Sequence, residues 1–252
     1  MKQPFLFIVL MWVATGYTQS CLPDVNFWGD FYGNLGDKEI ALSFFRVNDD
    51  SIVGNYRFTN NEKKIFAVQG VVSNCTYFLD AIDENGSVGK FVFSFTTDKT
   101  KKHEQYTGAF TSTAQQKNKL SLQLRTMVGG TLSQRYFELF GTTDEVDSFA
   151  VKVKTAIANN DVHWLASNCV YPLSIYAGSH RPNMVKNKQE FFAAYKKFFT
   201  QPFKNKFSLM RCYNMLSNHV GAGMGSGEAW INNMPGSTKA SYSYGISSFN
   251  IF

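Results

Sequence analysis

The chain has 252 residues, of which 44% are hydrophobic and 17% charged, and its formal net charge is +6. This composition is typical of a globular protein and excludes a long disordered or fibrous chain. Lys and Arg are scattered among acidic residues with no run of five like charges, so no nucleic-acid partner is expected.

Residues 1–20 have the three-part layout of a secretory signal peptide. A short basic start is followed by the apolar run "PFLFIVLMWV" and then by small or polar residues. The run is too short to span a bilayer core of roughly 30 Å. We therefore expect an exported, periplasmic protein; the alternative is an N-terminal core helix.

The four cysteines allow two interpretations. Residues 18–21, "TQSC", partly resemble a bacterial lipobox, in which Cys21 would carry a lipid anchor to the outer membrane and be the protein's only membrane attachment. Alternatively, export favours disulfides, and the local pairing is Cys21 with Cys75 and Cys169 with Cys212. No CxxC spacing or histidine cluster accompanies them, so neither a metal site nor a cofactor is expected.

The region from about residue 27 to 140 has the alternation of β-strands. In "SIVGNYRF" and "KFVFSF" every second residue is apolar or aromatic, and polar turn sequences such as "DENGS" separate the segments. This pattern predicts an antiparallel meander closed into a barrel or a small sandwich, with the phenylalanine side facing inward.

At residue 142 the apolar period becomes helical. Thr143 is expected to cap a first helix that ends at Asn159–Asn160, and Asp161 a short second one. A strand follows in "CVYPLSIY", with Pro172 restricting it to a sheet edge or a strand start. Asn187 opens a third helix that Pro202 should end, and strands complete the chain. The predicted segments are 1–20, 21–141 and 142–252.

The third segment resembles the nuclear transport factor 2-like superfamily. The resemblance rests on the first amphipathic helix with "NND" and "YPL", on "NKQEFFAAYKKFFTQ" and on "GAGMGSGEAWI". It implies an α+β cone, in which a curved sheet wraps against helices, and a sheet-mediated homodimer. The resulting fold class is α+β: an N-terminal antiparallel barrel or sandwich followed by the cone.

The stretch "HVGAGMGSGEAW" has glycine at every second position from 221 to 227. Neither the Walker spacing nor the dinucleotide fingerprint is present. A hairpin with a two-residue turn at Gly225–Ser226 is predicted instead. Its register would pair Gly221 with Trp230, so that the indole covers bare backbone.

The same resemblance implies a pocket inside the cone. Some members of the superfamily are enzymes. Candidate ligand-binding residues for that pocket are Glu228, Trp230, His219 and Tyr171. Glu228 and His219 would lie four ladder positions apart, roughly 13 Å, which argues against a catalytic dyad.

No catalytic residues are assigned, and the sequence favours a non-enzymatic protein. We expect an exported binding protein, in specific form an inhibitor or immunity-type protein with a protein partner in the cell envelope. The alternative is a carrier or enzyme that takes a small apolar ligand into the cone.

Overall fold

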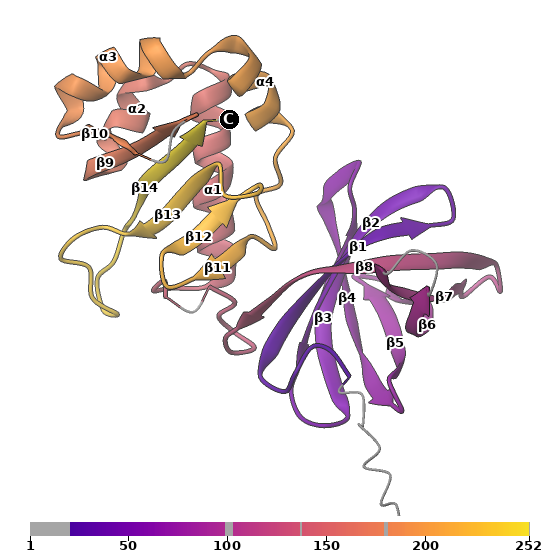
Figure 1. Ribbon diagram of the computed structural model, residues 1–252. Helices are drawn as coiled ribbons and strands as arrows, with labels where there is room; N and C mark the ends of the chain where they lie inside the picture. The colour runs from indigo at the N-terminus through magenta and orange to yellow at the C-terminus, as the bar shows by residue number, and fades with distance from the viewer. Residues whose placement is uncertain (1–20, 99–102, 137, 179–180, 252) are drawn as a thin grey trace, which may run out of the picture.

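A computed structural model describes residues 21–98, 103–136, 138–178 and 181–251. The predicted signal peptide at 1–20 lies outside the described residues. The chain forms an N-terminal β-barrel followed by an α+β unit, so its fold class is α+β (Figure 1). The barrel strands end at Gly129 and the first helix begins at Thr143, with an irregular linker between them.

The barrel is an eight-stranded antiparallel meander. Each strand pairs with the next one in the chain, and β8 returns to pair with β1. This closure confirms the predicted meander and decides for a barrel over a sandwich. The strands are β1 (Phe27–Leu35), β2 (Lys38–Arg46), β3 (Ser51–Phe58), β4 (Asn61–Ser73), β5 (Thr76–Asp83), β6 (Gly86–Asp98), β7 (His103–Ser112) and β8 (Lys117–Gly129).

Aromatic side chains fill the interior of the barrel. Phe44 and Phe93 are 0% and 1% exposed, and the rings of Tyr77 and Phe93 stack with centroids 4.8 Å apart. Burying each such ring stabilises the fold by about 2–3 kcal/mol. The prediction that the phenylalanine face points inward is confirmed.

Two glycines allow neighbouring strands of the barrel to approach closely. A Cβ atom at Gly54 would lie 2.1 Å from the carbonyl oxygen of Ser43, and one at Gly108 would lie 2.0 Å from that of Val92. No side chain can occupy those positions, so glycine is needed where the sheet curls on itself.

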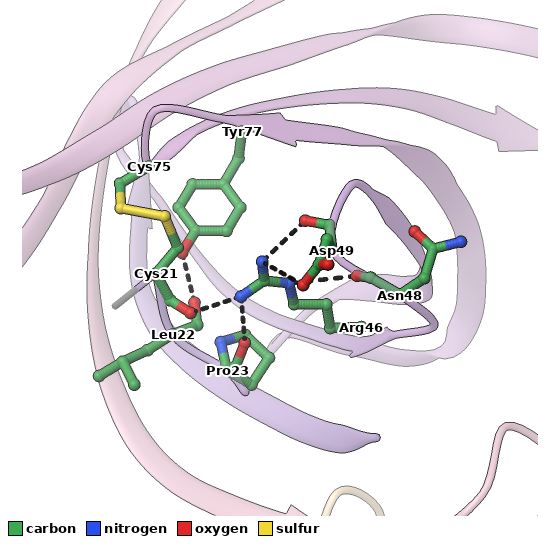
Figure 2. The surroundings of a disulfide bond; sticks show 8 residues. All are labelled: Cys21, Leu22, Pro23, Arg46, Asn48, Asp49, Cys75 and Tyr77. Atoms are coloured by element: carbon green, nitrogen blue, oxygen red, sulfur yellow. Dashed lines mark hydrogen bonds and ion pairs between the residues drawn. A yellow bond between two sulfur atoms is a disulfide. The ribbon is translucent and has the colours of Figure 1, made fainter. Parts of the chain in front are cut away.

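A disulfide attaches the start of the described chain to the barrel. Cys21 is bonded to Cys75, with their Cα atoms 5.0 Å apart. Figure 2 shows Arg46 reaching toward this segment, where its Nη1 donates to the Cys21 carbonyl at 2.8 Å, while the Tyr77 hydroxyl donates to the Leu22 carbonyl. The lipidation candidate is therefore corrected, because a thioether anchor would need the Cys21 sulfur that the disulfide occupies.

The α+β unit has four helices among its described residues and a mixed six-stranded sheet in the order β10-β9-β14-β13-β12-β11. Strand β14 runs parallel to β9, and the other pairs are antiparallel. The elements are α1 (Thr143–Ala158), α2 (Val162–Ser167), β9 (Cys169–Ala177), β10 (Asn183–Val185), α3 (Lys188–Phe198), α4 (Gln201–Ser208), β11 (Leu216–Asn218), β12 (Gly221–Met224), β13 (Ala229–Asn233) and β14 (Tyr244–Ile251).

Most of the predicted helix boundaries are confirmed. Asp161 and Asn187 cap α2 and α3, as expected. The cap of α1 is Thr142 rather than Thr143, because Thr142 forms a capping box with Glu145. Pro202 does not simply end α3, because it lies in the first turn of α4, a helix that was not predicted. Proline is tolerated there because the backbone amides of a helix's first turn have no intrahelical acceptor.

Strand β9 also differs from the prediction. It lies between β10 and β14 rather than at an edge, and Pro172 lies inside the strand rather than at its start. Pro172 is accommodated because the pairing of β9 with β14 shifts between the partners Ile246 and Ser248, so that the proline sits at an irregularity where no ladder bond is needed.

The helices pack on one face of the sheet (Figure 1), and aromatic side chains occupy the space between them. Phe191, Phe207 and Phe249 are each 0% exposed, and Phe199 contacts Phe249 with ring centroids 4.8 Å apart. This space is a packed core. Among the described residues, no helix has the length and apolar character needed to cross a membrane.

The predicted Cys169–Cys212 disulfide is wrong in this structure. Both thiols are free and buried. Cys169 begins β9, whereas Cys212 precedes β11, and three strands separate β9 from β11 in the sheet. Four strand spacings amount to roughly 19 Å, whereas a disulfide needs Cα atoms within about 7 Å.

Candidate functional site at the junction of the two units

The segment between α4 and β11, residues 209–215, lies against the barrel through two reciprocal contacts. The Arg211 guanidinium carbon is 4.2 Å from the centre of the Tyr32 ring on β1. In the opposite direction, the guanidinium of Arg57 on β3 lies 4.0 Å from the Tyr213 ring centre. Each unit thus contributes one arginine and one tyrosine, and each cation–π contact stabilises the junction by about 0.5–2 kcal/mol.

A buried ion pair holds the linker to the barrel. Arg135 in the linker and Asp30 on β1 are 1% and 0% exposed, and they form a direct ion pair. Arg135 also donates to the Ser43 hydroxyl at 3.0 Å, and Ser43 and Thr126 each donate to Asp30. Burial, the largest single effect, lowers the pKa of Arg135, but the charge and hydrogen bond of Asp30 together with Tyr136 and Tyr32 outweigh it, and the pKa is raised. The linker therefore enters the junction in one fixed position.

Tyr136, the next residue, connects the linker to helix α1. Its hydroxyl donates to Asp147 Oδ1 at 2.6 Å and accepts from the Met215 amide at 3.2 Å. Burial raises the pKa of Asp147 to about 6, although the Tyr136 hydrogen bond and the charge of Arg57 oppose the shift. Asp147 is therefore a carboxyl group that titrates near neutral pH at the junction.

An open groove of about 670 Å³ lies between helix α1 and the hairpin formed by β3 and β4. Two aliphatic side chains are exposed on its opposite walls: Ile65 from the barrel, 50% exposed, and Val151 from α1, 51% exposed. The charged residues that line it are three bases and three acids: Arg57, Lys63, Lys154, Glu62, Asp144 and Asp147. The groove is thus apolar in part and carries no net charge.

Two buried polar atoms in residues of this groove have no hydrogen-bond partner among the described residues. They are the Arg57 Nε and the Tyr213 hydroxyl oxygen. An unsatisfied buried polar atom costs about 1–3 kcal/mol. A bound group that reached either atom would remove that cost.

The groove can bind more readily than it can catalyse. Asp147 has a suitable pKa for proton transfer, but its Oδ1 is already engaged by Tyr136. Lys154 donates to the Met210 carbonyl at 2.7 Å. Burial raises the pKa of the Cys212 thiol to about 12, so the thiol is a poor nucleophile. Across the described residues, no three His, Cys, Asp or Glu side chains are grouped to hold a metal ion.

The predicted glycine hairpin forms, but its register differs. The turn spans four residues, 225–228, and Trp230 pairs with Gly223 instead of Gly221. The indole does cover bare backbone, since a Cβ at Gly223 would lie 3.3 Å from it. The longer turn arises because the Met224 carbonyl accepts from both the Gly227 and the Glu228 amides, at 2.9 and 3.0 Å.

Trp230 does not face the core between the sheet and the helices. Its neighbours on the strand, Ala229 and Ile231, are both 0% exposed and belong to that core. Side chains alternate across a sheet, so Trp230 lies on the other face, away from the helices.

Glu228 lies in the turn and has a structural role. Its Oε2 accepts from the Ser226 amide at 2.6 Å, and its Oε1 is 3.0 Å from the Lys206 ammonium group. The carboxylate is 3% exposed. It therefore holds the turn and is already paired.

The four candidate pocket residues do not come together in one place. Tyr171 packs against the helix–sheet core and donates to the Ala166 carbonyl at 2.8 Å. His219 is exposed between β11 and β12, where it lines a small cavity with Glu138. Because Trp230 and Glu228 also lie elsewhere, the four residues do not line one common pocket.

Sequence reasoning missed the residues of the junction groove. Arg57, Asp147 and Tyr213 come from a strand, a helix and a loop that are distant in the chain. None belongs to a short motif. The one available signal is Asp147 on the buried side of α1, between Val146 and Ala150, where an acidic residue is unusual.

Comparisons with family models, with curated proteins and with solved structures find no match to this chain.

Proposed function

We propose that this chain is an exported, non-enzymatic binding protein, and that its ligand is a protein of the cell envelope that docks in the groove between α1 and the β3–β4 hairpin. The observation that carries the proposal is the exposure of Ile65 and Val151, 50% and 51%, on opposite walls of that groove. Exposed apolar side chains that face one another across a groove are typical of interaction sites.

The packing of both units favours a surface site over an internal one. Aromatic rings occupy the barrel interior and the space between helices and sheet. The alternative, a carrier or enzyme with a small apolar ligand inside a hollow cone, gains no support from this packing.

The charges of the groove bear on the chemistry of the partner. With three acids and three bases among its lining residues, the groove does not favour a strongly charged partner over a neutral one. It suits a segment that presents apolar side chains flanked by polar groups, as a folded protein does. An inhibitor or immunity-type protein, which covers a partner enzyme, is the specific form of the proposal.

We also propose that the protein is exported and that its α+β unit is related to the nuclear transport factor 2-like superfamily. The Cys21–Cys75 disulfide supports export, because disulfides persist in oxidising compartments. The packing of the helices on one face of the mixed sheet supports kinship of the α+β unit with the nuclear transport factor 2-like superfamily. A homodimer formed through the sheet stays a prediction.

The test combines crosslinking with affinity measurement. A photo-crosslinking residue at position 151 is used to capture the partner from envelope extract, and the purified partner is then titrated against Ile65→Asp and Val151→Asp variants. A charge in the apolar centre of an interface should weaken binding by about tenfold or more. Val92→Asp is the matched control, because Val92 is 43% exposed on the outer face of β6 and outside the groove.

The proposal fails if both groove variants bind the captured partner as tightly as the Val92→Asp control does. It also fails if position 151 crosslinks to a second copy of this chain instead of to another protein.

A further inference from the structure

A second groove borders segment 209–215; it shares Tyr213 with the groove of the proposed function, and its other lining residues are different. Its volume is about 500 Å³, within the usual range of small-molecule sites, roughly 300–1,000 Å³. The barrel contributes Tyr32, Arg125 and Thr126, and the α+β unit contributes residues 209, 211 and 213–216 together with the hairpin turn at 225–226.

The charged residues that line the groove are all positive. Two arginines, Arg125 and Arg211, line it, and no acidic residue does. The carboxylates nearest in the chain to lining residues are already engaged: Asp30 with Arg135, and Glu228 with Lys206. Among the described residues that line the groove, no carboxylate therefore neutralises its positive charge.

The two arginines are held differently. The Arg211 guanidinium carbon lies 4.2 Å from the centre of the Tyr32 ring, and this contact holds the guanidinium beside the groove. Arg125 is exposed on β8 and makes no hydrogen bond, ion pair or ring contact with any described residue. One arginine is thus preorganised and the other is available to close on a ligand.

Unsatisfied donors accompany these charges. Asn214 is 9% and Tyr213 is 3% exposed, and both line the groove. Neither the Asn214 Nδ2 nor the Tyr213 hydroxyl has a hydrogen-bond partner among the described residues. Guanidinium, amide and hydroxyl donors together match the acceptor oxygens of a carboxylate or a phosphate.

We infer that this groove binds a small organic molecule that carries a carboxylate or phosphate group. The oxyanion lies between Arg125 and Arg211, and the organic part contacts the apolar lining, to which Leu209, Met215 and Leu216 contribute. The volume exceeds what a bare inorganic anion needs, which is why the ligand is organic. The glycine-rich hairpin has a place in this site, because its turn forms one edge.

Calorimetric titration of the full mature chain with three aromatic probes tests the inference. Phenyl phosphate and benzoate carry the two candidate anions, and benzyl alcohol is their neutral counterpart. Saturable binding of either anion without binding of benzyl alcohol is expected, and the tighter anion identifies the class. Loss of one charged donor in Arg125→Gln should weaken the anion about tenfold. Lys117→Gln, an exposed charge at the other end of β8, should leave the affinity unchanged.

Arg125→Gln is the decisive variant because Arg125 makes no hydrogen bond, ion pair or ring contact with the described residues whose loss could disturb the fold. Arg211→Gln should weaken binding as well, while also removing the contact with Tyr32. The inference is overturned if neither anion binds saturably, if benzyl alcohol binds as tightly as the anions, or if Arg125→Gln binds like the unmodified protein. Ile65→Asp and Val151→Asp should not alter anion binding, so this result is independent of the proposed protein partner.

Discussion

Replacing Arg135 by methionine tests whether the linker is held to the barrel by charge. The substitution keeps much of the side-chain length but removes the ion pair with Asp30 and the hydrogen bond to Ser43. Among the described residues, Asp30, which is 0% exposed, then keeps only the hydroxyl donors of Ser43 and Thr126. A buried carboxylate that loses its charge partner costs about 3–5 kcal/mol, which is a large part of the total stability of a domain, about 5–15 kcal/mol.

Urea unfolding followed by tryptophan fluorescence measures this loss, because Trp28 lies 5.6 Å from the Arg135 guanidinium. Arg125→Met is the matched control: this exposed arginine on β8 has no partner among the described residues, so its replacement should change stability by less than about 0.5 kcal/mol. Adding Asp30→Asn to Arg135→Met should restore part of the loss, since the uncompensated charge is removed. A loss below about 1 kcal/mol in Arg135→Met, typical of solvated pairs, would refute the reasoning.

Two further predictions concern stability. The Cys21–Cys75 disulfide closes a separation of 54 residues, so Cys75→Ser should cost about 4 kcal/mol in urea unfolding; reductant should lower the midpoint of the unmodified protein and leave that of the variant unchanged, and an equal effect on both would contradict the assignment. Because the pKa of Asp147 is raised to about 6, from about 3.9 in the unfolded chain, its contribution to stability is full below about pH 4 and is lost as the pH rises through 6. This loss is at most about 3 kcal/mol. Asp147→Asn should flatten this part of the pH profile, whereas Asp37→Asn, an exposed control, should not; identical profiles for the two variants would show that Asp147 is not the group responsible.

The local structure of this chain follows from its sequence, because strands and helices are specified over a few residues. Alternating apolar residues predicted the strands and the inward phenylalanine face, and Asp161 and Asn187 cap helices where their side chains can reach the next free amides. Pro202 shows the limit of such reading, since the same residue can end one helix or begin another.

Tertiary structure alone decided how distant residues meet. The closure of β8 on β1, the four-residue turn that pairs Trp230 with Gly223, and the free Cys169 and Cys212 thiols depend on packing. Both junction grooves depend on it as well: their residues come from separate strands, a helix and a loop, and no sequence pattern connects them. Short-range periodicity determined the elements of this protein, whereas the contact between the barrel and the α+β unit created its candidate binding sites.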